Sequence, residues 1–136
     1  MRRFALTLLI LGLPGVAPAQ PLASCERVDG STRPGIMPAT AHEVLADAEG
    51  VRRVLLTLRN GTRTTTEFTP TGGGVSVRLA TFPDGNAPGQ VRAVFNRAVV
   101  EPSGTYLFET WVRGPQDPAP LHNWYRLRCA APGATK

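Results

Sequence analysis

The sequence is poor in the residues from which most active sites are built. Its 136 residues include two cysteines and two histidines, with no Cys-x-x-Cys pair and no Gly-x-Ser-x-Gly nucleophile motif. Its histidines and acids do not have the spacing of metal ligands, and Gly72-Gly73-Gly74 lacks the Gly-Lys-Ser/Thr ending of a phosphate loop. We therefore expect a non-catalytic protein without a metal or cofactor. A small hydrolase is kept as an alternative function.

Long hydrophobic runs are also lacking. The longest apolar run, Phe4 to Leu13, is about half of the roughly 20 residues that a membrane-spanning helix needs. It follows Arg2-Arg3 and precedes Ala17-Pro18-Ala19, which is the arrangement of a cleaved secretion signal. The sequence therefore predicts a signal peptide over residues 1–19 and export to the periplasm or the extracellular space. We expect no membrane span.

The two cysteines lie near the two ends of the predicted mature chain. In an oxidising compartment, Cys25 and Cys129 are expected to form one disulfide that closes almost the whole domain. Leu22-Ala23-Ser24-Cys25 also resembles the lipobox of bacterial lipoproteins, in which the cysteine is acylated. Acylation of Cys25 is the alternative, and it would leave Cys129 without a partner.

Charge of either sign is sparse. Charged residues make up 18% of the chain, and loss of Arg2 and Arg3 with the signal leaves 13 basic against 10 acidic side chains. The basic residues, all arginine except Lys136, are scattered singly or in pairs, whereas binding of a phosphate backbone calls for a basic stripe. We expect no nucleic-acid partner. The sequence carries no signal for the oligomeric state.

From Val51 onward, apolar residues alternate with polar ones, which is the period of a half-buried strand. Alternation and turn residues together predict a mainly β protein, an antiparallel meander of about six strands that forms a small barrel or sandwich. Asn60-Gly61 predicts a type I′ hairpin between the first two strands. The predicted strands are 51–59, 62–69, 75–81, 91–100, 105–113 and 121–129.

The regions outside these strands are less regular. We expect an extended N-terminal arm over residues 20–38, a single β domain over 39–130 and a flexible tail over 131–136. Thr40-Ala41-His42-Glu43 fits a helix capping box, which would start a short helix over 41–49. The same segment also fits a strand over 42–46 followed by a turn over 47–50. Both interpretations stay open at this point.

The last two predicted strands form a hairpin whose pairing can be proposed from its residue types. Opposite charges and aromatic residues come to face each other in one register, and a slip by one residue would separate them. The proposed pairs are Glu109 with Arg126, Trp111 with Trp124 and Arg113 with His122 on one face, and Phe108 with Leu127 and Thr110 with Tyr125 on the other.

This register gathers tryptophan and basic side chains on one face of the hairpin. If the face is exposed, it is suited to an anionic glycan or a protein partner; if another part of the chain covers it, the tryptophans belong to the core. We expect a secreted or periplasmic domain that binds an envelope protein or glycan. The candidate binding residues are Trp111, Trp124, His122, Arg113, Arg126 and Arg128.

One short motif resembles a known family. Small periplasmic barrels that inhibit lysozyme carry a Ser-Gly-x-x-Tyr loop that enters the lysozyme cleft, and Ser103-Gly104-Thr105-Tyr106 resembles this loop shortened by one residue. The resemblance covers four residues and implies an alternative function as an inhibitor of a cell-wall hydrolase. The shorter spacing redirects the tyrosine, so no functional residue is transferred from the family.

Overall fold

The computed structural model describes residues 22–31 and 39–130 of the chain. Within these ranges the regular structure consists of strands, without a helix, and all nine strands belong to one antiparallel sheet. The mainly β prediction is confirmed, whereas the expected number of six strands is too low. The strands are β1 (Ala23–Gly30), β2 (Ala39–Asp47), β3 (Gly50–Leu58), β4 (Arg63–Glu67), β5 (Thr69–Gly72), β6 (Val75–Pro83), β7 (Val91–Val100), β8 (Tyr106–Arg113) and β9 (Leu121–Cys129).

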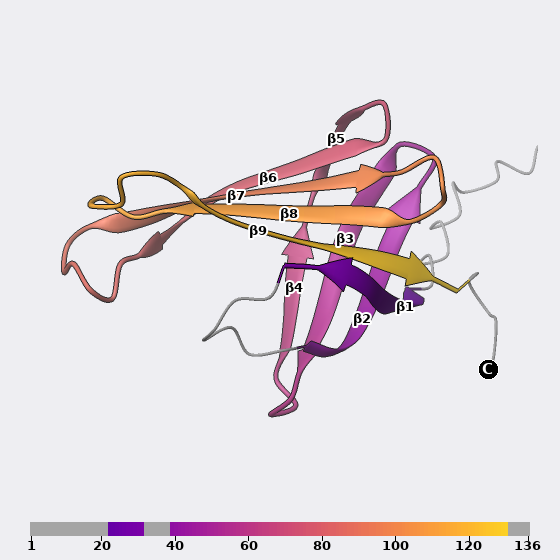
Figure 1. Cartoon of the computed structure of the whole chain (residues 1–136), viewed down its shortest axis with the longest axis horizontal. Coiled ribbons are helices and arrows are strands. Elements are labelled where there is room, and N and C mark those ends of the chain that lie inside the picture. Colours follow the sequence, from indigo (N-terminus) through magenta and orange to yellow (C-terminus); the bar gives the residue numbers. More distant parts are fainter. Residues whose placement is uncertain (1–21, 32–38, 131–136) are drawn as a thin grey trace, which may run out of the picture.

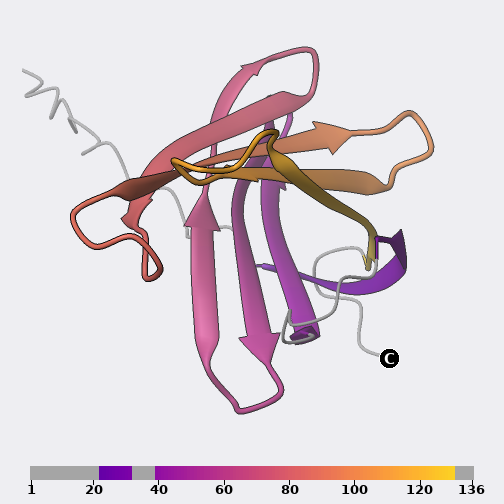
Figure 2. The same ribbon diagram turned by 60° about the vertical axis from the view of Figure 1, so that its left-hand side comes forward.

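The sheet is a meander that curls into a nearly closed barrel. Its strand order is β4-β3-β2-β1-β9-β8-β7-β6-β5, so the first and last strands pair and the sheet edges are β4 and β5. The long strands β6 to β9 run across β2 to β4, and their far ends extend beyond them (Figures 1 and 2). One face of the sheet points into the barrel and carries the core residues, such as Ala98, Phe108 and Leu127. The opposite face of β6 to β9 is called the outer face.

Phe68 divides the strand that the sequence predicts over 62–69. Its amide donates a 2.9 Å hydrogen bond to the carbonyl oxygen of Arg52, and its buried ring lies 6.1 Å from that of Phe108. Because the ring turns into the core, the chain leaves β4 at one edge of the sheet and continues as β5 at the other. The sequence did not predict this division, because the threonines on both sides of Phe68 favour a strand and suggest a continuous one.

The N-terminal arm predicted over 20–38 contains a strand of the barrel. Residues Ala23–Gly30 form β1, which lies between β2 and β9 and pairs with both. Its mostly polar residues show no sustained alternation, so nothing in the local pattern indicates a strand inside the sheet. The signal peptide predicted over 1–19, residues 32–38 of the arm and the tail predicted over 131–136 lie outside the described residues.

The ambiguous segment 41–49 is a strand followed by a turn. The alternative of a short helix is wrong, because β2 runs through Asp47 and β3 begins at Gly50. The Asp47 carboxylate fixes this turn by accepting a 2.8 Å hydrogen bond from the amide of Glu49 and a 2.7 Å bond from Nε of Arg52. Pairing with β3 thus prevails over the capping-box pattern.

The turn at Asn60-Gly61 differs from the type I′ hairpin that the sequence predicts. A type I′ turn needs positive φ at both central residues, and in the described part of the chain only glycines have it. Leu58 and Thr62 close the hairpin, and Gly61, at φ 81°, ends a three-residue loop. The side chain of Asn60 favours this loop, because its Oδ1 accepts a 2.9 Å bond from the amide of Thr62.

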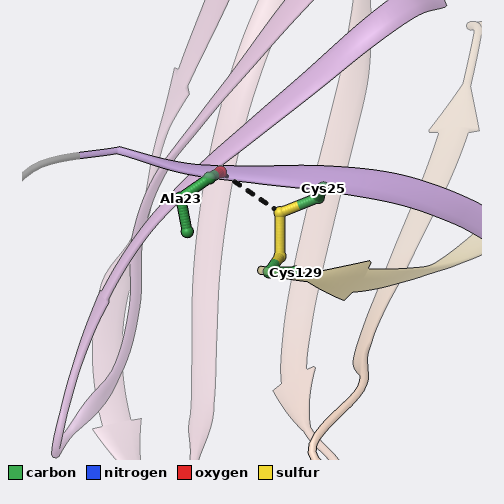
Figure 3. Close-up of a disulfide and its surroundings, with 3 residues drawn as sticks. All are labelled: Ala23, Cys25 and Cys129. Atoms are coloured by element: carbon green, nitrogen blue, oxygen red, sulfur yellow. Dashed lines mark hydrogen bonds between the residues drawn. A yellow bond between two sulfur atoms is a disulfide. The ribbon is translucent and has the colours of Figure 1, made fainter. Parts of the chain in front are cut away.

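The disulfide joins the first strand to the last. Cys25 and Cys129 are directly opposite each other in β1 and β9, and their bridge is confirmed (Figure 3). The sulfur of Cys25 lies 3.3 Å from the carbonyl oxygen of Ala23, and Figure 3 shows the two residues side by side. The bridge borders the core, whose buried members are Val44, Val51, Val54, Phe68, Ala98, Phe108 and Leu127. No helix in the described ranges is long and apolar enough to cross a membrane.

Candidate functional site

The hairpin of β8 and β9 places the candidate residues in a register two residues away from the predicted one. Trp111 faces His122, Glu109 faces Trp124 and Leu107 faces Arg126. The five pairs proposed from the sequence are therefore wrong. A shift by two residues keeps every side chain on the same face, so the hydrophobic pattern cannot tell the two registers apart. The predicted set of residues on the outer face is unchanged by the correction.

Four side chains lie opposite one another across the outer face and form what we call the outer row. Trp111 is at its centre, with its ring centroid 5.5 Å from that of Phe95 on β7 and 4.7 Å from that of His122 on β9. The rings of Trp111 and His122 are stacked, with an angle of 11° between their planes. The row consists of Leu79, Phe95, Trp111 and His122, one residue from each of β6 to β9.

A carboxylate lies beside the outer row. Glu109 has an 11% exposed side chain and accepts a 2.7 Å hydrogen bond from Nε of Arg97, which is directly opposite it on β7. The Arg97 guanidinium lies 5.5 Å from the centre of the Trp111 ring. Nε2 of His122 is 3.3 Å from Oε1 of Glu109 but is not aligned for a hydrogen bond. Glu109 thus links the charged and aromatic parts of this face.

Arg126 lies over the ring of Trp124, the second tryptophan of this face. Its guanidinium lies 5.1 Å from the centre of the Trp124 ring, and its Nε donates a 2.8 Å hydrogen bond to Oε1 of Glu101. A weaker contact of 3.5 Å joins its Nη1 to Oδ2 of Asp29. The hydrogen bond from Arg126 lowers the pKa of Glu101, so this carboxylate stays ionised.

Four of the six residues predicted for the site lie together, namely Trp111, His122, Trp124 and Arg126. Arg113 is at one end of the face, beside the loop between β8 and β9, and Arg128 is at the other, 3.7 Å from Glu26. The sequence prediction missed Leu79, Phe95 and Arg97. The tight loop between β7 and β8 was a signal for Phe95 and Arg97, because it places Arg97 opposite Glu109, whereas Leu79 is placed by the pairing of β6 with β7.

The outer row is exposed at Leu79 and Phe95 and half-buried at Trp111 and His122. The Leu79 side chain is 74% exposed and that of Phe95 36%, and neither tryptophan belongs to the buried core. The alternative in which the tryptophans form the core therefore does not describe this part of the chain. Exposed apolar side chains next to one another on a sheet are typical of an interaction surface.

The loop that resembles a lysozyme-inhibitor loop is a tight turn. The amide of Glu101 bonds the carbonyl oxygen of Thr105 at 2.9 Å, and that of Gly104 bonds the carbonyl oxygen of Glu101 at 2.9 Å. The ring of Tyr106 packs toward the core, 6.5 Å from that of Phe108. The exposed part of this turn therefore consists of Pro102, Ser103 and Gly104, without the tyrosine.

The described residues contain no group of three or more histidine, cysteine, aspartate or glutamate side chains that could hold a metal ion. Comparisons of the chain with protein-family models, with curated proteins and with solved structures found no match. The function is therefore argued from the geometry of the outer face.

Proposed function

We propose that this protein is an exported, non-catalytic domain that binds a protein of the cell envelope through the outer face of its barrel. The observation that carries the proposal is the outer row, in which Leu79, Phe95, Trp111 and His122 form a partly exposed aromatic and aliphatic strip across four strands. Tryptophan and arginine are the residues that most often dominate the binding energy of protein interfaces.

The ring contacts favour a protein partner over a glycan. A sugar ring stacks on the open face of an aromatic ring, but Trp111 lies between Phe95 and His122 from the two flanking strands. One face of Trp124 is likewise covered by Arg126. The Trp111 ring, at the centre of the strip, therefore has less open face for a sugar to stack on, which favours contact with an apolar protein surface.

The ion pairs favour the same conclusion. An anionic glycan would need free cations, whereas Arg97 is paired with Glu109, Arg126 with Glu101 and Arg128 with Glu26. Among the arginines of the predicted site, Arg113 alone has no carboxylate within ion-pair distance in the described ranges. A nearly neutral face with an apolar strip at its centre resembles the desolvated core and polar rim of a protein interface.

Export of the domain is supported by the disulfide. A bridge between Cys25 and Cys129 is stable in the periplasm or outside the cell, and it agrees with a signal peptide over 1–19. A sulfur in a disulfide cannot also carry a lipid, so the bridge favours a soluble exported form over acylation at Cys25.

The hydrolase alternative has less support. A nucleophilic enzyme needs a hydroxyl or thiol within hydrogen-bond reach of a base. Within the described ranges, neither His42 nor His122 takes part in such a bond, and His122 stacks on Trp111 beside the Glu109 carboxylate.

Site-specific photocrosslinking in the native envelope tests the proposal. A photoreactive amino acid at Leu79, in the outer row, is compared with the same group at Thr65, which is exposed on the edge strand β4. We expect one protein to be captured from Leu79 only, and to be lost when Trp111→Ala and Trp124→Ala are introduced together. Equal capture from both positions, capture of glycan alone, or no capture from Leu79 would refute the proposal. A captured cell-wall hydrolase would identify the partner class of the inhibitor alternative.

A further inference from the structure

A cavity of about 230 Å³ lies inside the barrel, on the side of the sheet opposite the outer row. The core residues Val54, Phe68 and Phe108 border it, and the half-buried Leu56 and Leu58 continue the apolar wall on β3. Arg27 on β1 also lines the cavity, and its side chain is exposed to solvent. The cavity thus changes from apolar to cationic between the core and the surface.

The polar side chains at the cavity are mostly hydrogen-bond donors. Asn96 donates a 2.8 Å bond to Oγ1 of Thr110, which leaves the hydroxyl hydrogen of Thr110 available. The hydroxyl of Ser31 donates a hydrogen bond to the side-chain oxygen Oδ1 of Asn123. Among the described residues, the side-chain NH2 group of Asn123 donates no hydrogen bond. Burial raises the pKa of Tyr125, so its phenol keeps its proton and donates as well. These donors suit a ligand that accepts hydrogen bonds.

The charge of the cavity is positive. Arg27 donates a 2.8 Å bond to the carbonyl oxygen of Ser31 and has no carboxylate within ion-pair distance in the described ranges. Both His42 and Tyr125 line the cavity with Arg27: burial and then the charge of Arg27 lower the pKa of His42, and the same charge partly opposes the rise that burial causes in the pKa of Tyr125. Glu109 also borders the cavity, but its carboxylate is paired with Arg97. The cavity therefore offers a cation without a bound counter-charge.

We propose that this cavity binds a small apolar monocarboxylate, with the hydrocarbon part against Leu56, Leu58 and Phe108 and the carboxylate at Arg27. An apolar cavity of about 150 Å³ holds one benzene molecule. The larger volume here therefore accommodates a ring with a short carboxylated chain. The site is on the opposite side of the sheet from the outer row, so it does not depend on the proposed partner.

Binding of 3-phenylpropanoate and of its neutral amide to the oxidised protein tests this site. We expect the acid to bind and to shift the NMR signals of the Leu56 and Leu58 methyl groups, while those of Leu79 and Leu121 at the far end of the sheet stay in place. The amide, which has nearly the same shape without the charge, should bind about tenfold more weakly or worse.

Two arginine variants locate the carboxylate. Arg27→Gln should weaken binding of the acid about tenfold and leave that of the amide nearly unchanged. The matched control is Arg59→Gln, which removes an exposed arginine that does not line the cavity and should have no effect. The proposal is overturned if the acid does not bind at millimolar concentration, if acid and amide bind equally, if both arginine variants behave alike, or if the Leu79 and Leu121 signals shift as much as those of Leu56 and Leu58.

Discussion

Trp111 stacks on His122 directly across β8 and β9, with 4.7 Å between the ring centroids. Trp111 and Trp124 are not opposite each other, because Trp124 faces Glu109. This pairing replaces the contact between the two tryptophans that the sequence suggests. It also leads to a prediction that separates the two registers.

A double-mutant cycle between Trp111→Ala and His122→Ala should give a coupling energy of about 0.5–1.5 kcal/mol, the range measured for stacked ring pairs. The cycle between Trp111→Ala and Trp124→Ala should give a clearly smaller value, since these residues are not cross-strand partners. Both cycles are measured by urea unfolding. The reverse order of the two coupling energies would support the register proposed from the sequence.

The disulfide should contribute strongly to stability, because it closes a loop of 104 residues. Replacing Cys25 and Cys129 together by serine is expected to lower the free energy of unfolding by up to about 4.7 kcal/mol, the chain-entropy value for a loop of this length. Reductant should destabilise the wild type and leave the serine variant unchanged. A stoichiometric reaction of the unreduced wild type with a thiol reagent would show that the bridge is not formed.

Two leucines, in β9 and β6, should differ in their effect on stability. Leu127 is fully buried in the core, whereas Leu79 is 74% exposed. Leu127→Ala should therefore destabilise the domain by about 2–5 kcal/mol. Leu79→Ala should change the free energy of unfolding by about 0.5 kcal/mol or less. Similar losses for both variants in urea unfolding would mean that the outer row is covered in solution.

His42 should make stability depend on pH. Burial, aided by the charge of Arg27, holds the pKa of His42 below its ordinary value of 6.5. The unfolded chain therefore takes up this proton at a higher pH than the folded one, and stability present above pH 6.5 is lost as the pH falls through the folded pKa. Tyr125, the other titratable group against the His42 ring, keeps its proton throughout this range.

A His42→Gln variant should lack this loss of stability, as measured by urea unfolding at several pH values between about 7 and 5. The difference between the wild-type and variant curves isolates the contribution of His42 from that of the carboxylates. If the two curves run parallel, His42 is not desolvated inside the barrel.

The sequence predicted the C-terminal half of the fold more closely than the N-terminal half. The predicted strands 91–100 and 121–129 coincide with β7 and β9, because alternation is regular there and turn residues bound it. β1 is mostly polar and β5 has four residues, one of them Pro70, so neither produces a periodic signal. β1 depends on pairing with the distant strand β9, and β5 is a short edge strand that pairs only with β6 among the described strands, so local pattern reveals neither.

The candidate site could be predicted only as a face. The alternation of β8 and β9 places Trp111, His122 and Trp124 on one side in both the predicted and the observed register, because the two differ by two residues. The contact of Trp111 with Phe95 required the pairing of β7 with β8, and the cavity at Arg27 required β1 to join the sheet. These features come from the pairing of strands, which the alternation within a single strand does not reveal.

Two phenylalanines on opposite faces of β6 and β7 allow the most direct test of the proposed binding surface. Phe95 lies in the outer row, and Phe82, which is 44% exposed, lies on the inner face, where Arg78 contacts its ring. The measurement is the affinity of Phe95→Ala and Phe82→Ala for the protein captured from Leu79. We predict that Phe95→Ala weakens binding about tenfold and that Phe82→Ala leaves it unchanged. Equal affinities for the two variants, or a loss confined to Phe82→Ala, would contradict the assignment of binding to the outer face.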